Sequence, residues 1–168
     1  SSRLMEGDEA ATVSALTESR MVFRSHIEGG GGRVVDTAGD SVLAVFDSPV
    51  EAVRRALAIQ EALTAANAGR AEDRRMRFRI GINLGDVIEK ADGTVYGDGV
   101  NIAARLESLS EPGGLCVSGT VHDMVDGTVP AAFESAGDQQ VKNIARPVRA
   151  WRLCQAGQAP WRLEGAGA

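Results

Sequence analysis

Apolar residues recur at helical spacing in three stretches of the chain. In residues 7–27 they stand three, seven and four positions apart, and this stretch stops at four consecutive glycines, residues 29–32. A second stretch begins at Ser48, with proline next and glutamate three positions later, which is the pattern of a capped helix N-terminus. A third covers residues 100–109. These stretches predict three amphipathic helices, the second of which ends near Gly69.

Runs rich in β-branched residues separate these helices. Residues 34–35 and 42–46 flank a short corner that carries Asp40, so they predict a β-hairpin with a carboxylate at its tip. Residues 76–89 alternate apolar and polar positions up to a bend at residues 83–85, and predict a kinked strand or a second hairpin. Further strands are expected at residues 115–117, 132–134 and 148–153, and a brief helix through residues 121–125.

The order of these elements predicts the fold class. Helix, hairpin, helix, strand, helix, strand, helix and strand follow one another, which is typical of an α+β domain. We expect a ferredoxin-like fold, with a mostly antiparallel sheet and helices packed on one side of it. Residues 1–154 are expected to form this single domain, and residues 155–168, rich in alanine, glycine and glutamine, a linker or tail.

Composition and charge exclude several functional classes. With 168 residues, 43% of them hydrophobic, the chain can bury a core without metal or disulfide staples. A net charge of -5 and the lack of a basic cluster argue against binding to a nucleic-acid backbone. No apolar run reaches the roughly 20 residues of a membrane span. Cys116 and Cys154 stand far apart without a CxxC partner, so we expect free thiols and a reducing, cytoplasmic setting.

Two features exceed what a fold requires. The first is Asp40, and the second is a glycine-bearing loop, residues 96–99, that leads into a helix displaying Asn101 and Arg105. Mg²⁺ prefers carboxylate and phosphate oxygens, and arginine donates in a fork to phosphoryl groups, so this set suits phosphate chemistry. Taken locally, a turn-forming aspartate and a solvated helix face explain the same residues.

Five blocks of the sequence follow the order of a known family. They are residues 32–40 (GRVVDTAGD), 78–87 (FRIGINLGDV), 96–106 (YGDGVNIAARL), 112–118 (PGGLCVS) and 141–148 (VKNIARPV). Through these blocks, residues 8–153 resemble the catalytic domain of class III nucleotidyl cyclases, in the bacterial adenylate/guanylate cyclase branch. The resemblance covers most of the chain.

The resemblance implies an enzyme that cyclises a purine nucleoside triphosphate, ATP or GTP. The ribose 3′-oxygen attacks the α-phosphate and pyrophosphate leaves, with two Mg²⁺ or Mn²⁺ ions assisting. Asp40 matches a metal ligand of the family, Asn101 the residue that orients the ribose, and Arg105 the residue on the reacting phosphates. The family builds its sites between two head-to-tail subunits, which implies a homodimer with shared active sites. Signal transduction is the implied role, and the tail suggests further domains of the same protein.

Two regions depart from the family's pattern. The family's first metal aspartate lies in a strand just before the position of Ser2, and residues 1–168 do not contain it. We therefore expect Asp40 as the one metal aspartate of this sequence. Either the leading strand lies outside the sequence or two metals are not held in the usual way. The family often carries Lys-Gly-Lys at the phosphate-binding end, where this chain has Lys142-Asn143-Ile144, so Lys142 is a partial substitute.

The positions that match base recognition leave both purines open. Asp36 stands where many adenylate cyclases have lysine, and Thr94 where they have aspartate. An ionised carboxylate only accepts hydrogen bonds, so Asp36 could receive the two N–H donors of guanine while Thr94 donates to O6. Alternatively, Asp36 could take the adenine N6 amino group alone. The hydrogen-bond count favours GTP, whereas adenylate activity is the commoner assignment among bacterial relatives. We expect ATP and cAMP, with GTP and cGMP as the alternative.

A non-catalytic function is the rival hypothesis. The replaced lysine and the missing leading aspartate fit a cyclase-like module that binds a nucleotide or dimerises in order to regulate a partner domain. The presence of Asp40, Asn101 and Arg105 together favours the enzyme, an adenylate or guanylate cyclase.

Overall fold

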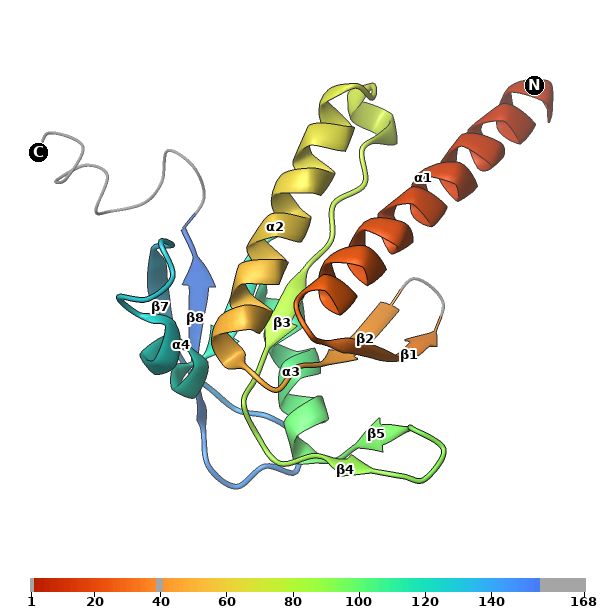
Figure 1. Cartoon of the computed structure of the whole chain (residues 1–168). Coiled ribbons are helices and arrows are strands. Elements are labelled where there is room, and N and C mark those ends of the chain that lie inside the picture. The colour runs from red at the N-terminus through yellow and green to blue at the C-terminus, as the bar shows by residue number, and fades with distance from the viewer. Residues whose placement is uncertain (1, 39–40, 155–168) are drawn as a thin grey trace, which may run out of the picture.

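A computed structural model describes residues 2–38 and 41–154, with side chains described for residues 9–35 and 41–154. Helices are interspersed with single strands and pairs or runs of strands along this part of the chain (Figure 1). In order they are α1 (Ser2–Gly29), β1 (Arg33–Ala38), β2 (Ser41–Val45), α2 (Pro49–Ala68), η1 (Glu72–Arg74), β3 (Ile80–Ile82), β4 (Ile88–Glu89), β5 (Val95–Tyr96), α3 (Asp98–Leu109), β6 (Leu115–Ser118), α4 (Gly119–Val125), β7 (Phe133–Gln139) and β8 (Val148–Leu153). None of the helices in these ranges is long and apolar enough to span a bilayer.

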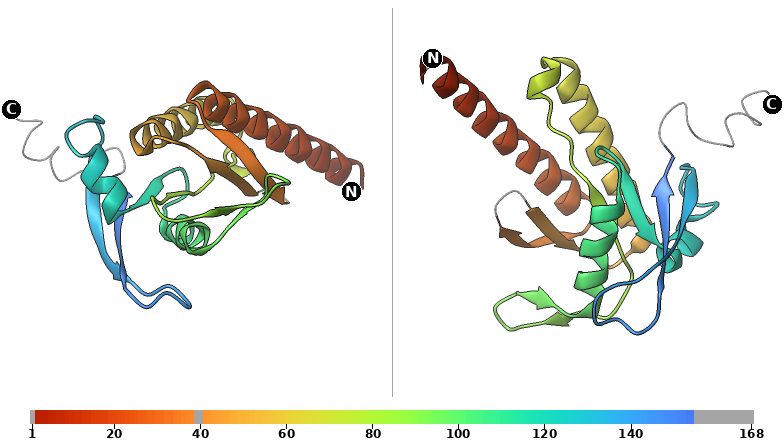
Figure 2. Two further views of the ribbon diagram at one scale, coloured as in Figure 1. Left: turned by 60° about the horizontal axis from the view of Figure 1, so that its bottom comes forward. Right: turned by 180° about the vertical axis from the view of Figure 1, so that it is seen from behind.

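Four of the strands form the largest sheet described. Its strand order is β3-β6-β8-β7, in which β3 runs parallel to β6 and the other neighbours are antiparallel. Side chains alternate across β6. Leu115 and Val117 pack against α2 and α4, whereas Cys116 between them packs against Leu106 of α3. Helices therefore cover both faces of the sheet, with α2 and α4 packed on one face and α3 on the other (Figure 2).

The predicted fold class is confirmed. The domain is α+β, and all of its strand pairs except β3–β6 are antiparallel in the part of the chain described. The placement of α3 differs from the expected one-sided packing. Its physical reason lies in β6, where every residue is at most 3% exposed. A strand buried on both faces requires a cover on each side, and α3 provides the second one.

Two hairpins lie outside this sheet. The β1–β2 hairpin was predicted, and its strands pair antiparallel from Arg33 opposite Val45 to Ala38 opposite Ser41. The β4–β5 hairpin pairs the end of the predicted strand with a segment that was expected to be loop. An ion pair between Arg33 and Glu89 joins the two hairpins.

The glycine run after α1 has a structural cause. Gly31 adopts a φ of 81°, in the left-handed region that glycine tolerates best. A Cβ atom on Gly32 would lie 2.8 Å from the ring of Phe46, so the backbone can approach that side chain only without one. The chain thereby turns from α1 into β1 while α1 stays packed on α2.

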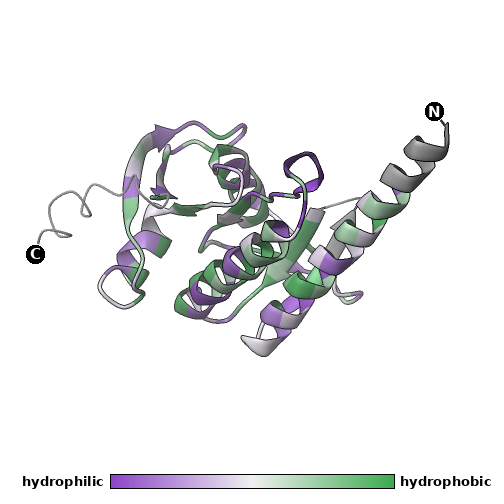
Figure 3. Cartoon of the chain, turned by 90° about the horizontal axis from the view of Figure 1, so that it is seen from above, coloured by the Kyte–Doolittle hydropathy of each residue, from purple (hydrophilic) through white to green (hydrophobic). Residues whose placement is uncertain are grey.

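The two long helices pack through their apolar faces. Ile27 of α1 forms a buried cluster with Ile59 and Leu63 of α2. Hydrophobic and hydrophilic residues alternate along both helices (Figure 3), as the sequence pattern predicts. At the start of α2 the Ser48 hydroxyl accepts a hydrogen bond from the backbone N–H of Glu51 at 3.1 Å, which confirms the predicted N-cap.

The strand predicted at residues 76–89 is shorter than expected. Only Ile80–Ile82 and Ile88–Glu89 are strands. Before β3, side chains of α2 take the place of a strand partner: the Asn67 amide bonds both backbone groups of Met76, and Gln60 donates to the carbonyl oxygen of Phe78. These backbone groups are hydrogen-bonded without a partner strand, so the apolar alternation alone predicted a strand that is too long.

Candidate active site

Asn101 and Arg105 lie on the exposed face of α3, one helical turn apart. At 3.6 residues per turn their side chains are separated by about 40° around the helix axis. Ile102 and Leu106 face the sheet instead, while Ala103 faces β3. The amide and the guanidinium therefore point away from the body of the chain, and both residues are exposed. The predicted juxtaposition of these two groups is consistent with this placement.

Close backbone contacts hold α3 against β3. A Cβ atom on Gly81 would overlap the backbone of Ala103 and Glu107, so α3 can rest on β3 at this distance only over a glycine. Gly97, with a φ of 120°, starts the helix directly after β5. The exposed pair on α3 is thus presented by a helix that the body of the domain fixes tightly.

The first turn of α3 is also hydrogen-bonded to the segment after β3. The backbone N–H of Gly99 donates to the carbonyl oxygen of Asp86 at 3.1 Å. The side-chain amide of Asn83 donates to the carbonyl oxygen of Gly99, also at 3.1 Å. Asn83 was not among the predicted site residues, because its hydrogen bond joins positions far apart in the sequence and no local pattern signals it.

Thr94 lies in the turn of the β4–β5 hairpin, just before β5. Its carbonyl oxygen accepts from the N–H of Lys90 at 2.8 Å, and its own N–H donates to the Asp92 carboxylate at 2.9 Å. These N–H and hydroxyl groups of Thr94 hold the pKa of Asp92 below its ordinary value. Because β5 continues directly into α3, Thr94 stands on the same connected segment as Asn101.

Lys142 lies in the connection between β7 and β8, and its side chain is exposed. The N–H of Ile144 donates to the carbonyl oxygen of Val141 at 3.0 Å, which closes a turn around Lys142 and Asn143. Asn143 has a φ of 66°, in the left-handed region. Asparagine tolerates that conformation better than most residues, which explains how it fits where the family often has glycine. Val148, where the chain re-enters the sheet, packs in the α3 cluster.

The two acidic positions of the prediction lie on the β1–β2 hairpin. Asp36 is in β1, where its backbone pairs opposite Leu43 of β2. The side chain of Asp36 and the whole of Asp40 are outside the described residues. Their expected roles in base recognition and metal binding therefore stay predictions.

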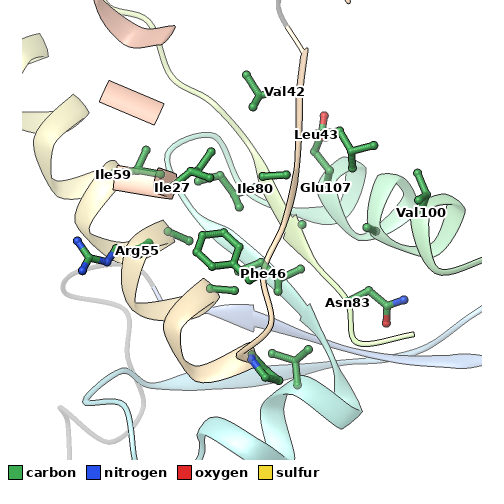
Figure 4. Close-up of a pocket in the computed structure, with 18 of the residues that line it drawn as sticks. Ile27, Val42, Leu43, Phe46, Arg55, Ile59, Ile80, Asn83, Val100 and Glu107 are labelled. Atoms are coloured by element: carbon green, nitrogen blue, oxygen red, sulfur yellow. The ribbon is translucent and has the colours of Figure 1, made fainter. Parts of the chain in front are cut away.

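A groove, which we call the β2–β3 groove, separates the β1–β2 hairpin from the four-stranded sheet (Figure 4). Its volume is about 460 Å³. Among the described strands, β2 pairs only with β1, and β3 only with β6, so each has one edge without a strand partner. The groove is mostly apolar and is lined among others by Leu43, Phe46, Ile59, Ile80, Ile82 and Val100.

The side chains described do not form a metal site by themselves. Within residues 9–35 and 41–154, no group of three or more His, Cys, Asp or Glu residues is placed to hold a metal ion. The described carboxylates thus do not supply the donor set that two divalent ions need. Asp40 is the candidate ligand that remains, and it lies outside these ranges.

The match to a family model decides the relationship. The model of the adenylate and guanylate cyclase catalytic domain matches residues 2–155. The chain belongs to this family. The cyclase domain thus carries Asn101 and Arg105 within a segment that the family model covers.

Individual relatives agree with this assignment. The cyclase domain is 44% identical over 151 residues to the putative adenylate cyclase 3 of Rhizobium meliloti (strain 1021), a match that covers 89% of this chain and 26% of that protein. It is 31% identical over 173 residues to adenylate cyclase 1 of the same organism, covering 88% of this chain and 26% of that protein. The chain therefore spans about a quarter of the length of these relatives.

A solved structure has the same fold. The cyclase domain is similar to an adenylate/guanylate cyclase/hydrolase from Silicibacter pomeroyi, with a TM-score of 0.79 and 42% sequence identity. The match covers 90% of this chain and 88% of that one. The resemblance inferred from the five sequence blocks is confirmed.

Proposed function

We propose that this domain converts a purine nucleoside triphosphate into a 3′,5′-cyclic nucleotide and pyrophosphate, for signal transduction. The ribose 3′-oxygen forms a bond to the α-phosphorus, and the bond from that phosphorus to the oxygen bridging to the β-phosphate breaks. The observation that carries the proposal is the exposed pair of Asn101 and Arg105 on a rigidly held helix of a cyclase-family domain. Arg105 would donate to the α-phosphoryl oxygens as they gain charge, and Asn101 would orient the ribose.

Two copies of the chain would build each site. The side chains of Asn101 and Arg105 point away from their own domain, so a nucleotide bound to them needs its other contacts from a second surface. Exposed apolar side chains next to the start of α3 suit a protein partner; they are Leu84, Val87, Ile88 and Tyr96. A homodimer in which each copy completes the other's site accounts for both features.

Metal ions belong to this proposal. Mg²⁺ or Mn²⁺, bound as a pair, would activate the ribose oxygen and stabilise the leaving pyrophosphate. Asp40 is the residue of this chain that would hold them. The β2–β3 groove lies between the free edges of β2 and β3, so a further strand bound there would join the hairpin to the sheet and could carry a second metal ligand.

Substrate recognition is assigned to three more residues. Asp36 and Thr94 would contact the purine, and the exposed Lys142 would contact the phosphates. We propose ATP as the substrate, with GTP as the alternative, because the relatives of 44% and 31% identity are named adenylate cyclases. The free thiols of Cys116 and Cys154 fit a cytoplasmic site of action, where nucleoside triphosphates are available.

The proposal is tested by assaying the purified full-length protein with Mg²⁺ or Mn²⁺ and either ATP or GTP. We expect a cyclic nucleotide from at least one triphosphate, and about a hundredfold less from the Arg105→Ala variant, the scale of loss seen when one donor to a developing oxyanion is removed. Arg54→Ala, an exposed arginine on α2, serves as a control that keeps the wild-type rate. Nucleotide binding without any cyclic product would instead favour the rival hypothesis of a regulatory module.

A further inference from the structure

Asn83 connects the β2–β3 groove to the helix that carries Asn101 and Arg105. It follows β3 and lines the groove on the same side as Val100 in the first turn of α3 (Figure 4). Its side-chain Nδ2 donates to the carbonyl oxygen of Gly99, two residues before Asn101, at 3.1 Å. One side chain therefore touches both the groove and the first turn of α3.

This hydrogen bond is an addition to the helix rather than a requirement for it. In an α-helix the carbonyl oxygen of Gly99 accepts from the N–H four residues on, that of Ala103. A carbonyl oxygen has two lone pairs, and Asn83 uses the second one. The helix would thus form without Asn83, but its first turn would lose a contact that fixes it to the strand.

Both polar backbone groups of Gly99 form hydrogen bonds to the segment after β3. While Asn83 bonds its carbonyl oxygen, the N–H of Gly99 donates to the carbonyl oxygen of Asp86 at 3.1 Å. Gly99 is buried, and a Cβ atom there would lie 2.6 Å from the Asp86 oxygen and 3.0 Å from a Val87 methyl carbon. Residues 83–86 therefore contact the first turn of α3 at Gly99, two residues before Asn101.

We propose that Asn83 is a positioning residue, which sets the place and angle of α3 and hence of Asn101 and Arg105 relative to the bound triphosphate. This inference rests on the proposed cyclase function. Displacements of about 1 Å in a reacting group can reduce a rate by about a hundredfold, because an in-line displacement depends on alignment. Asn83 itself does not touch the substrate in this account.

The Asn83→Asp variant tests the role with little change in side-chain size. An ionised aspartate cannot donate a hydrogen bond, and it places a negative charge beside the Gly99 carbonyl oxygen. We expect kcat to fall by about tenfold to a hundredfold, with KM for the triphosphate within about twofold of wild type. A protonated aspartate can donate, so the kcat defect should shrink as the pH is lowered, whereas the defect of Asn83→Ala should not.

Asn67→Asp is the matched control. The Asn67 amide also donates to a backbone carbonyl oxygen, that of Met76, and it accepts from the N–H of the same residue. It lies at the end of α2 and has no described hydrogen bond to α3. The control breaks the hydrogen bond to the Met76 carbonyl oxygen, while its new charge lies beside the guanidinium of Arg70, and it should leave kcat within about twofold of wild type.

Amide hydrogen exchange gives a readout that does not depend on catalysis. In Asn83→Asp the amides of residues 100–103 should exchange faster than in wild type, and in Asn67→Asp they should not. Unchanged exchange in Asn83→Asp overturns the inference even if the wild-type protein makes no cyclic nucleotide. With an active wild-type protein, equal kcat losses in the two variants, or no loss in Asn83→Asp, overturn it as well.

Discussion

At the scale of single residues, exposure and chemistry separate the candidate site from the core. Asn101 and Arg105 are exposed, although nothing in the fold requires an amide and a guanidinium there. Helical spacing predicted that they would share a face, and this is borne out by the bounds of α3. The contact of Asn83 with Gly99 was not predictable in the same way, since it joins residues 16 positions apart through a side chain.

The two cysteines give a prediction about reactivity. Burial raises the pKa of the Cys116 thiol, an effect that the positive charge of Arg152 only partly offsets, and burial also raises the pKa of Cys154. A raised pKa leaves less of the reactive thiolate at about pH 8. Cys116 is fully buried and Cys154 partly exposed, so iodoacetamide should modify Cys154 first and Cys116 only when the protein unfolds.

Mass spectrometry of the native protein at increasing reaction times measures both rates. Unfolding in urea supplies the control, in which the two thiols should react at similar rates. If Cys116 of the native protein reacts as fast as Cys154, the packing described for β6 is contradicted. Because the pKa of Cys116 is higher in the folded than in the unfolded protein, the unfolded thiol ionises first as the pH rises above the ordinary thiol pKa. The contribution of Cys116 to the free energy of unfolding therefore decreases as the pH rises.

At the scale of elements, the sequence predicted the helices well and the strands less well. The N-cap at Ser48 and the glycine run after α1 are local signals, and both bound the helices where expected. The segment before β3 has a strand-like pattern, but Asn67 and Gln60 of α2 bond its backbone instead of a neighbouring strand. Such tertiary contacts override a pattern that is read over a few residues.

Gly81 gives a prediction at this scale. In Gly81→Ala the new methyl group would meet the backbone of α3, which cannot rotate away as a flexible side chain could, so the helix has to shift. We expect a loss of about 1 to 3 kcal/mol in the free energy of unfolding, typical of overpacking, together with lower cyclase activity. Denaturant unfolding curves measure the first effect and the nucleotide assay the second.

Gly69→Ala is the control for this substitution. Its new Cβ atom would lie 3.9 Å from the nearest atom, the carbonyl oxygen of Ala66, and its φ of -87° suits alanine. The change should alter the free energy of unfolding by less than about 1 kcal/mol. If both variants unfold at the same denaturant concentration, the close contact between β3 and α3 does not hold the helix.

At the scale of the whole molecule, the domain has two surfaces to which further chain segments or a second copy could bind. The β2–β3 groove lies between two strand edges without partners among the described strands, and the face of α3 that carries Asn101 and Arg105 is exposed. The order of the five blocks predicted the family, and the order of the helices and strands predicted the α+β class, because both orders extend over most of the chain. The packing of helices on both faces of β6, and the β2–β3 groove, depend on how the strands are arranged in space and were not predictable from the sequence.

If two copies share each active site, as we propose, then mixing two inactive variants should restore cyclase activity. Asp40→Ala would remove the metal ligand and Arg105→Ala the phosphate ligand, so neither homodimer has an intact site. In an equal mixture that exchanges subunits, half of the dimers pair the two variants and regain one intact site of two, which predicts about a quarter of the wild-type rate. Activity of the mixture no higher than that of either variant alone would contradict the shared site.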